Sequence, residues 1–134
     1  MQETTESAGQ GRTVVVVEDN VRSRRLVRDL LELNGFHPVE AESAEEGLAA
    51  VRETAPVLLL LDIQLPGMDG VAALRALRED PRTAGVPAIA VTAYAMRGDE
   101  ERLLEAGFDA YIAKPIDTRA FVPRLLAVLE ARGG

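Results

Sequence analysis

The chain has 134 residues and a formal net charge of −7 at pH 7, and it contains neither cysteine nor tryptophan. This length suits one compact domain, and 47% hydrophobic residues are too many for a disordered chain. The lack of cysteine excludes a disulfide framework, a zinc–thiolate site and thiol catalysis. The acidic balance argues against binding a nucleic-acid backbone by bulk charge.

The ends of the chain carry few structural signals. Residues 1–12 are polar, which predicts a flexible N-terminal tail and no signal peptide. The longest aliphatic run, residues 57–61, is too short to cross a bilayer, so a cytoplasmic protein is the default expectation. We expect the folded domain over residues 13–131 and a short C-terminal end at 132–134.

The first half of the domain alternates apolar runs with amphipathic segments. Residues 13–17 form an unbroken β-branched run, which is typical of a parallel strand buried on both faces. Asn20 can cap a helix over about 21–34. A weaker strand follows at 37–41, where Pro38 indicates an edge position.

The middle of the chain repeats this alternation. Residues 43–46 form a capping box that opens a helix ending near Thr54. The run 57–61 predicts a second fully buried strand, which ends before Asp62. Asp69 can then cap a helix over about 70–79.

The last part of the chain predicts two more strands and two more helices. Strands are expected at 88–92 and 109–113, and the helix between them begins at the acidic residues from Asp99. The final helix is expected over about 118–131, with Asp117 as a candidate cap. An early proline, Pro123, makes its first turn irregular. Five strands alternating with five helices predict a doubly wound α/β fold with right-handed crossovers.

Polar side chains stand where the predicted strands end. Glu18 and Asp19 follow the first strand, Asp62 the third, Thr92 the fourth and Lys114 the fifth. In open parallel sheets, ligands bind at the carboxyl ends of the strands. With the strand order 2-1-3-4-5, which is borrowed from one common type of doubly wound fold and does not follow from this sequence, the first and third strands are neighbours, so three carboxylates would share one pocket. Such a pocket needs a cation, and oxygen ligands with room for water favour Mg²⁺.

Each of these residues also has an ordinary explanation when it is taken alone. Acids before a helix are common caps, Asp62 could be a turn residue, and Thr92 could be one more β-branched strand residue. Lys114 is the only lysine among fifteen basic residues, which could be chance. These separate explanations do not account for five polar residues that all follow buried strands.

The chain resembles the receiver domain of two-component response regulators over about residues 13–131. The matching pieces lie at residues 14–20, 58–70, 91–93 and 111–116. Single-domain receivers of the DivK type and receivers carried by hybrid histidine kinases are the most similar. The resemblance implies a flavodoxin-like (βα)5 fold with a parallel sheet in the order 2-1-3-4-5.

The resemblance also implies the roles of the strand-end residues. Asp62 would accept a phosphoryl group from a phosphohistidine, and Thr92 and Lys114 would contact the phosphoryl oxygens. Tyr111 would be the switch aromatic that follows Thr92. The Lys114–Pro115 peptide bond is expected to be cis.

A magnesium ion is the cofactor that the resemblance implies. Asp19 and Asp62 would ligate Mg²⁺ directly, and Glu18 would do so through water or as a supporting acid. The backbone carbonyl of Gln64 would supply another ligand. The side chains of Gln64 and Tyr94 would border the approach of water and so tune the lifetime of the phosphoryl group.

Two other functions compete with a phosphorelay switch. A haloacid-dehalogenase-type phosphatase also uses a strand-end Asp, Mg²⁺ and a Lys. The sequence pattern of such enzymes has a second Asp two residues after the first, where this chain has Gln64. Without that base, self-phosphorylation and slow autodephosphorylation are the only reactions expected. A scaffold that works without phosphorylation would lack the acceptor, the acidic pair or the lysine. A receiver excised from a hybrid histidine kinase remains an alternative origin of the same module.

The signal is expected to leave through one face of the domain. That face comprises the helix that begins at Asp99, the strand 109–113 and the helix 118–131, and the loop 93–98 would absorb the movement. A histidine kinase or histidine phosphotransfer protein would supply the phosphoryl group, and a separate protein would be the downstream target. DNA binding and membrane insertion are not expected, and a homodimer formed on phosphorylation is left open.

Overall fold

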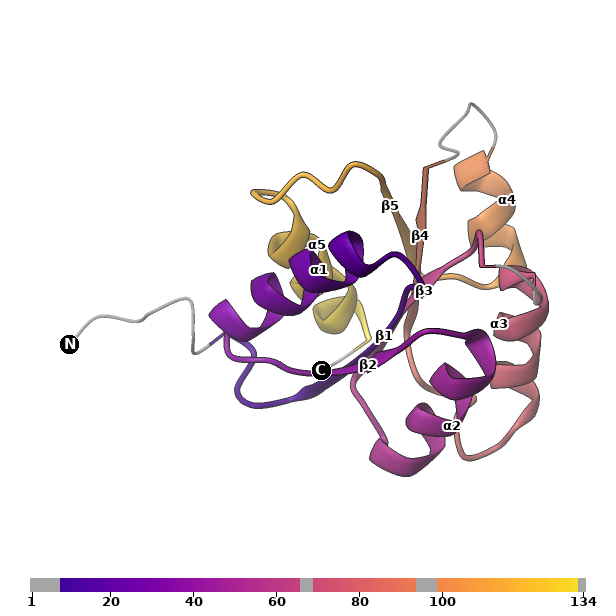
Figure 1. Cartoon of the computed structure of the whole chain (residues 1–134). Helices are drawn as coiled ribbons and strands as arrows, with labels where there is room; N and C mark the ends of the chain where they lie inside the picture. Colours follow the sequence, from indigo (N-terminus) through magenta and orange to yellow (C-terminus); the bar gives the residue numbers. More distant parts are fainter. Residues whose placement is uncertain (1–7, 66–68, 94–98, 133–134) are drawn as a thin grey trace.

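The computed structural model describes residues 8–65, 69–93 and 99–132, which form a five-stranded parallel sheet between two layers of helices (Figure 1). The sheet order is β2-β1-β3-β4-β5, which confirms the predicted fold class. No helix in the described part of the chain is long and apolar enough to span a membrane. The elements are β1 (Thr13–Val17), α1 (Val21–Leu33), β2 (His37–Ala41), α2 (Ala44–Thr54), β3 (Leu58–Asp62), α3 (Gly70–Glu79), β4 (Ala88–Thr92), α4 (Asp99–Ala106), β5 (Ala110–Ala113) and α5 (Phe121–Ala131).

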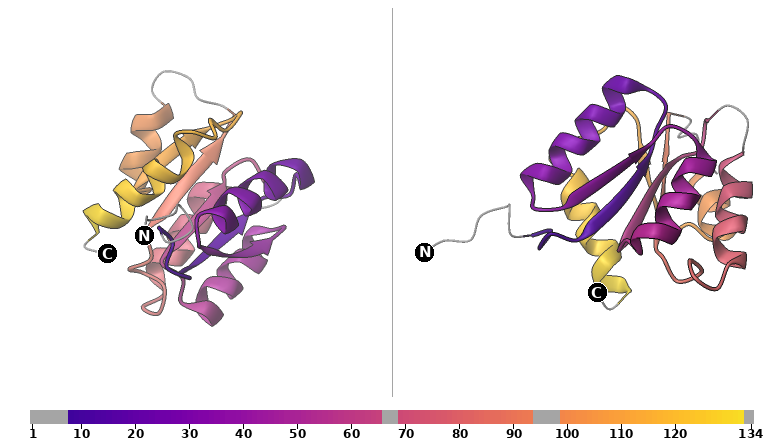
Figure 2. Two further views of the ribbon diagram at one scale, coloured as in Figure 1. Left: turned by 90° about the vertical axis from the view of Figure 1, so that its left-hand side faces the viewer. Right: turned by 60° about the horizontal axis from the view of Figure 1, so that its bottom comes forward.

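Two apolar layers cover the two faces of the sheet. Helices α1 and α5 lie on one face, and α2, α3 and α4 lie on the other (Figures 1 and 2). Successive side chains of a strand point to opposite faces, so Val14 and Val16 pack towards α1 and α5, whereas Val15 and Val17 pack towards the other helices. This double burial explains why β1, β3 and β4 contain continuous apolar runs rather than alternating patterns.

The polar residues that follow the strands lie at the carboxyl end of the sheet. The third strand runs over Leu58–Asp62, one residue later than predicted, because Asp62 still pairs with Val91 of β4. Pro38 lies in β2, which is an edge strand as predicted. A proline is tolerated there because one side of the strand needs no ladder partner.

The helix caps confirm most of the predicted starts. The side chains of Asn20, Ser43 and Asp69 each accept a backbone N–H in the first turn of the helix that follows. The start of α5 was predicted too early, because residues 118–120 form turns and the helix begins at Phe121. Pro123 therefore falls in the first turn, where helix N–H groups have no intrahelical partner.

The candidate cap of the last helix is also corrected. The Asp117 carboxylate accepts the Arg119 backbone N–H at 3.0 Å, and its carbonyl accepts the Ala120 and Phe121 N–H groups at 3.1 Å each. The residue at the start of α5, Ala120, makes no side-chain cap. Asp117 thus closes the turn that precedes the helix rather than capping the helix itself.

Part of the expected tail packs on the domain. The buried Gly9 donates its N–H to the Asn34 carbonyl at 2.7 Å, and a Cβ there would meet the backbone of Phe36. Arg12 lies over the Phe36 ring, with its guanidinium carbon 5.7 Å from the ring centroid. Part of the segment 9–12 therefore contacts the folded domain, through Gly9 and Arg12. Residues 1–7 lie outside the described residues.

Candidate functional site

Three carboxylates meet at the carboxyl ends of β1 and β3. These strands are neighbours, with Val17 opposite Leu61, so the residues that follow β1 lie beside the end of β3. One carboxylate oxygen each from Glu18, Asp19 and Asp62 lies within 4.8 Å of the other two. Glu18 and Asp62 are each 4% exposed, whereas Asp19 is exposed. The three predicted acids therefore do share one pocket.

Lys114 reaches this pocket from the end of β5. Its Nζ lies 2.6 Å from Glu18 Oε1 and 3.1 Å from Asp62 Oδ2, so one ammonium joins two of the three carboxylates. The Lys114 backbone N–H donates to the Thr92 carbonyl at 2.8 Å, which ties the segment to the end of β4. The Lys114–Pro115 peptide bond is cis, the geometry that the resemblance implied.

The electrostatics of the pocket favour one more cation. Burial raises the pKa of the Glu18 carboxyl, although hydrogen bonds from Lys114 and from the Asn20 backbone N–H act in the opposite direction. Burial alone would lower the pKa of Lys114, but its hydrogen bonds to Glu18 and Asp62 outweigh this effect and raise it. With all groups charged, three carboxylates face one ammonium. The surplus negative charge and the all-oxygen donor set suit a hard divalent ion.

Two hydrogen bonds fix the orientation of Glu18. Glu18 Oε2 accepts the Asn20 N–H at 3.0 Å, and the Glu18 carbonyl accepts a hydrogen bond from Arg24 Nη1 at 3.0 Å. Arg24 is itself held by Glu40, at 3.2 Å from Nε to Oε1. This use of Arg24 could not be predicted, because an arginine on a helix surface gives no sequence signal of a tertiary contact.

Gln64 makes one contact with the Asp62 carboxylate and one with the backbone after β4. Its backbone N–H donates to Asp62 Oδ1 at 2.8 Å, and its side-chain Oε1 accepts the Ala93 N–H at 2.8 Å. Only the backbone carbonyl and a role at the approach of water were predicted for this residue. The link to Ala93 has no sequence signal, because it joins a side chain to a backbone group 29 residues away.

Thr92 and Tyr111 lie on neighbouring strands and face the same side of the sheet. Thr92 ends β4 and is completely buried, and strand alternation places its side chain with those of Ala88 and Ala90. Tyr111 lies opposite Ala90 in β5 and packs against the same apolar layer. Tyr94, the other residue predicted to tune the lifetime, lies outside the described residues.

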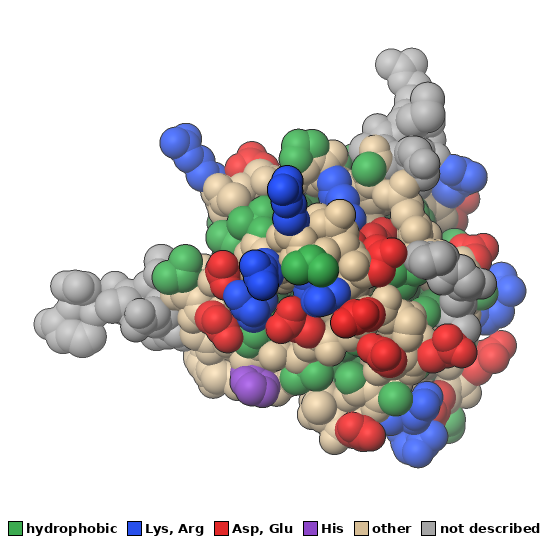
Figure 3. Space-filling model, viewed as in Figure 1, with side chains coloured by type: hydrophobic (Ala, Val, Ile, Leu, Met, Phe, Trp, Pro, Cys, Tyr) green, Lys and Arg blue, Asp and Glu red, His purple; other side chains and the backbone are tan. Residues whose placement is uncertain are grey.

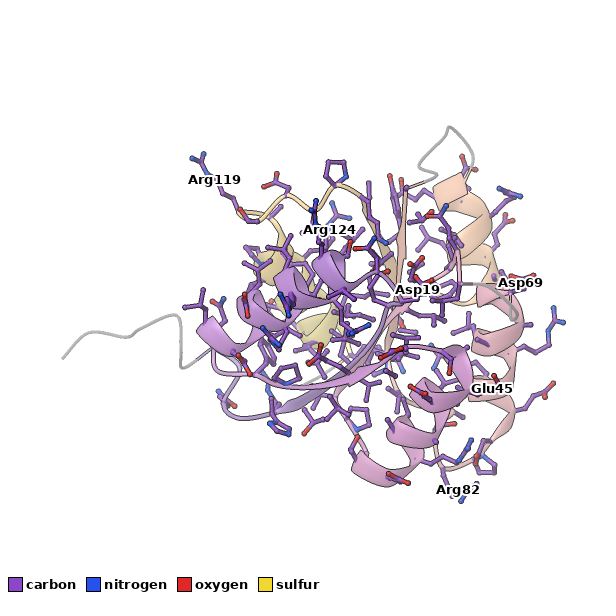
Figure 4. The ribbon with its side chains drawn as sticks, in the orientation of Figure 1. Asp19, Glu45, Asp69, Arg82, Arg119 and Arg124 are labelled. Atoms are coloured by element: carbon purple, nitrogen blue, oxygen red, sulfur yellow. The ribbon has the colours of Figure 1, made fainter. Side chains whose placement is uncertain are left out.

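The stick view places the exposed acid of the pocket in the fold. Asp19 lies where β1 ends, and the exposed Asp69 lies at the start of α3 (Figure 4). Arg119 lies, like Lys114, in the segment between β5 and α5. Its side chain points away from the domain, so it does not enter the pocket (Figure 4). The residues of the pocket therefore come from the segments that directly follow the strands, and the outward-pointing Arg119 is not among them.

Known proteins are similar to this chain in sequence and in fold. A family model of the response regulator receiver domain matches residues 14–126. The polar-differentiation response regulator DivK of Brucella ovis is 42% identical over 118 residues, which cover 88% of this chain and 96% of that protein. DivK of Brucella anthropi is 41% identical over the same shares of the two chains.

Solved structures give the same result. A CheY-like receiver domain from Methanospirillum hungatei superposes with a TM-score of 0.81 at 30% identity, and covers 91% of this chain and 96% of that one. The receiver domain of a sensor histidine kinase from Pseudomonas aeruginosa has a TM-score of 0.81 at 28% identity, covering 90% and 98% of the chains. That structure has a magnesium ion coordinated in its active-site cleft. The chain belongs to the response regulator receiver domain family of two-component systems.

Proposed function

We propose that this receiver takes a phosphoryl group from a phosphohistidine onto Asp62 and passes the signal to a partner protein. The observation that carries the proposal is the Lys114 ammonium, which bonds both Glu18 and Asp62 inside a cluster of three carboxylates. Family membership supports the same role.

The chain's own groups supply the parts of the transfer. An oxygen of the Asp62 carboxylate forms the new O–P bond while the N–P bond to the donor imidazole breaks. The electron pair leaves with the imidazole nitrogen, which takes a proton from solvent. Lys114 offsets charge on the phosphoryl oxygens, and the hydroxyl of Thr92, which ends the neighbouring strand, would contact them. The donor is already activated, so positioning is the main task of the site.

The residues present also fit a resident Mg²⁺ ion. Asp19 and Asp62 would ligate it directly, with Glu18 acting through water and the Gln64 backbone carbonyl as a further ligand. When bound, the ion would neutralise negative charge on the phosphoryl group and the acceptor. The exposed position of Asp19 leaves room for the waters that Mg²⁺ retains.

Replacing Asp19 by Asn weakens Mg²⁺ binding by about 10- to 100-fold, because the site loses one of its charged oxygens. Isothermal titration of the whole chain with MgCl₂ measures the change. Glu45→Gln is the matched control, since it removes one negative charge from the exposed first turn of α2. Equal weakening by both substitutions would mean that bulk charge, and not this pocket, holds the ion.

The donor protein can approach beside the lysine. A hollow of about 170 Å³ lies between the start of α1 and the segment after β5, lined by Leu26, Lys114 and Ile116 among others. Val21 and Leu26 are exposed apolar residues at this end of α1. Over α1 and β2, acidic and basic side chains alternate (Figure 3), and Arg24 and Arg28 both lie near Glu40. Such a mixed surface suits a protein partner, a histidine kinase or a phosphotransfer protein, better than a phosphate backbone.

The signal would reach a downstream protein through the face formed by α4, β5 and α5. Thr92 and Tyr111 share the sheet face that α4 covers, so movement of Thr92 towards a phosphoryl group opens space for Tyr111. Tyr111 is also one of the residues that line a hollow of about 230 Å³ beside the start of α5. A downstream protein would then bind a changed surface. Hydrolysis of the acyl phosphate is slow, because the neutral Gln64 amide cannot act as a general base.

Chemical mapping of the phosphorylated residue tests this proposal. The protein is treated with acetyl phosphate and Mg²⁺, reduced with borohydride, digested and sequenced by mass spectrometry. Reduction converts an aspartyl phosphate to homoserine, and we expect homoserine at position 62. Homoserine at position 19, or none at any position, would contradict the assignment of Asp62.

A further inference from the structure

The side chain of Gln64 connects the acceptor to the end of the neighbouring strand. Its backbone N–H bonds Asp62 Oδ1, while its Oε1 accepts the N–H of Ala93, each at 2.8 Å. Ala93 directly follows Thr92, at the point where β4 ends. A single residue thus contacts both the acceptor and the backbone that leads out of β4.

This bond stands where the sheet would otherwise continue. Asp62 lies opposite Val91, and the Ile63 N–H donates to the Val91 carbonyl at 3.1 Å. The next donor of β4 towards β3 is the Ala93 N–H, which a longer parallel ladder would join to a backbone carbonyl. Here it bonds the Gln64 side chain. A side-chain acceptor can rotate away without separating the strands, so this donor can change partners at low cost.

A phosphoryl group on Asp62 creates a competitor for the same donor. It brings nearly two negative charges and three strong acceptor oxygens. Lys114 and the Gln64 N–H already bond the carboxylate from which that group would extend. The end of β4 lies beside it and offers the Ala93 N–H. A charged phosphoryl oxygen is a stronger acceptor than a neutral amide oxygen.

We propose that Gln64 is a positioning residue that holds the Ala93 N–H while Asp62 is free and yields it to the phosphoryl group. The inference rests on the proposed function and adds a regulatory role for this side chain. The Gln64–Ala93 bond is present only in the unphosphorylated arrangement, so it opposes the phosphorylated one. Gln64 therefore sets how readily the Ala93 N–H changes its hydrogen-bond partner when Asp62 is phosphorylated.

Two substitutions separate the hydrogen bond from the volume of the side chain. Gln64→Met keeps a long side chain but has no comparable acceptor, whereas Gln64→Ala removes both. Both leave the backbone N–H and carbonyl in place. The probe is beryllofluoride in the presence of Mg²⁺, an analogue of the phosphoryl group that is not hydrolysed. Its equilibrium affinity is therefore independent of water access to an acyl phosphate.

We expect both variants to bind beryllofluoride roughly two- to tenfold more tightly than the wild type, the range that one lost hydrogen bond allows. Hydrogen exchange of the Ala93 amide in the free protein should speed up in both variants, because that amide loses its hydrogen-bond acceptor.

Two results would overturn the inference. One is wild-type affinity and wild-type Ala93 exchange in both variants. The other is tighter binding by Gln64→Ala alone, because that result would assign the effect to side-chain volume. Failure of the proposed function gives a different result, namely a wild-type protein that binds no beryllofluoride with Mg²⁺ present.

Discussion

Replacing Lys114 by Met slows phosphorylation of Asp62 by about 10²- to 10³-fold, the usual effect of removing one donor that faces developing negative charge. The ammonium lies 3.1 Å from Asp62 Oδ2 and 2.6 Å from Glu18 Oε1, in a pocket with two buried carboxylates. A charge in such a partly buried pocket acts more strongly on these oxygens than a charge in bulk water does. The rate of phosphate incorporation from acetyl phosphate at saturating Mg²⁺ measures the change.

Two controls identify the cause of that loss. Arg119→Met removes the same charge from an exposed side chain of the segment before α5, and it should leave the rate unchanged. Mg²⁺ should bind Lys114→Met at least as tightly as the wild type, because a cation has left the acidic pocket. Equal slowing by both substitutions, or loss of Mg²⁺ binding in Lys114→Met, would contradict a direct role for the ammonium.

The largest effect on stability is expected at the other end of the strands, where β4 and β5 begin. Asp109 Oδ2 accepts the Ala88 backbone N–H at 2.9 Å and lies 3.4 Å from Arg78, while its Oδ1 lies 2.8 Å from Arg132. This carboxylate joins the start of β4 to α3 and α5. Asp109→Ala lowers the free energy of unfolding by about 3 kcal/mol, because it leaves a half-buried Arg78 and a strand N–H without this acceptor.

Urea unfolding followed by circular dichroism measures this loss. The matched control is Asp29→Ala, whose carboxylate is 60% exposed and pairs with Arg28 at 3.2 Å on the surface of α1. We expect the control to change stability by no more than about 0.5 kcal/mol. If the two substitutions cost the same, the Asp109 contacts do not stabilise the fold as argued. At urea concentrations below its unfolding transition, Asp109→Ala should still be phosphorylated, since Asp109 lies at the opposite end of the strands from Asp62.

The sheet and the acidic pocket could be predicted because both depend on strong local signals. β1 and β3 each contain four consecutive apolar residues, 14–17 and 58–61, which is typical of a strand covered on both faces. Parallel strands end at one edge, so the position of Asp62 after one run and of Glu18 after another already placed them together. The position of Lys114 after β5 followed from the same rule.

The missed features depend on contacts that residue types do not encode. Gly9 packs through its backbone N–H and its lack of a Cβ, and a polar segment gives no signal of this. The late start of α5 results from turns closed by the Asp117 carbonyl, an atom that every residue has. The bond from Gln64 to Ala93 needs the exact separation of two strand ends. Such contacts become visible only when the chain is folded.

Intact mass is the most direct test of the central claim that Asp62 is a cation-dependent phosphoacceptor. Wild type and Asp62→Asn are incubated with acetyl phosphate and Mg²⁺, with and without excess EDTA. We predict one phosphate adduct on the wild type in Mg²⁺, and none on Asp62→Asn or in EDTA. A phosphate adduct on Asp62→Asn equal to that on the wild type would contradict the account. So would a wild type that carries no adduct.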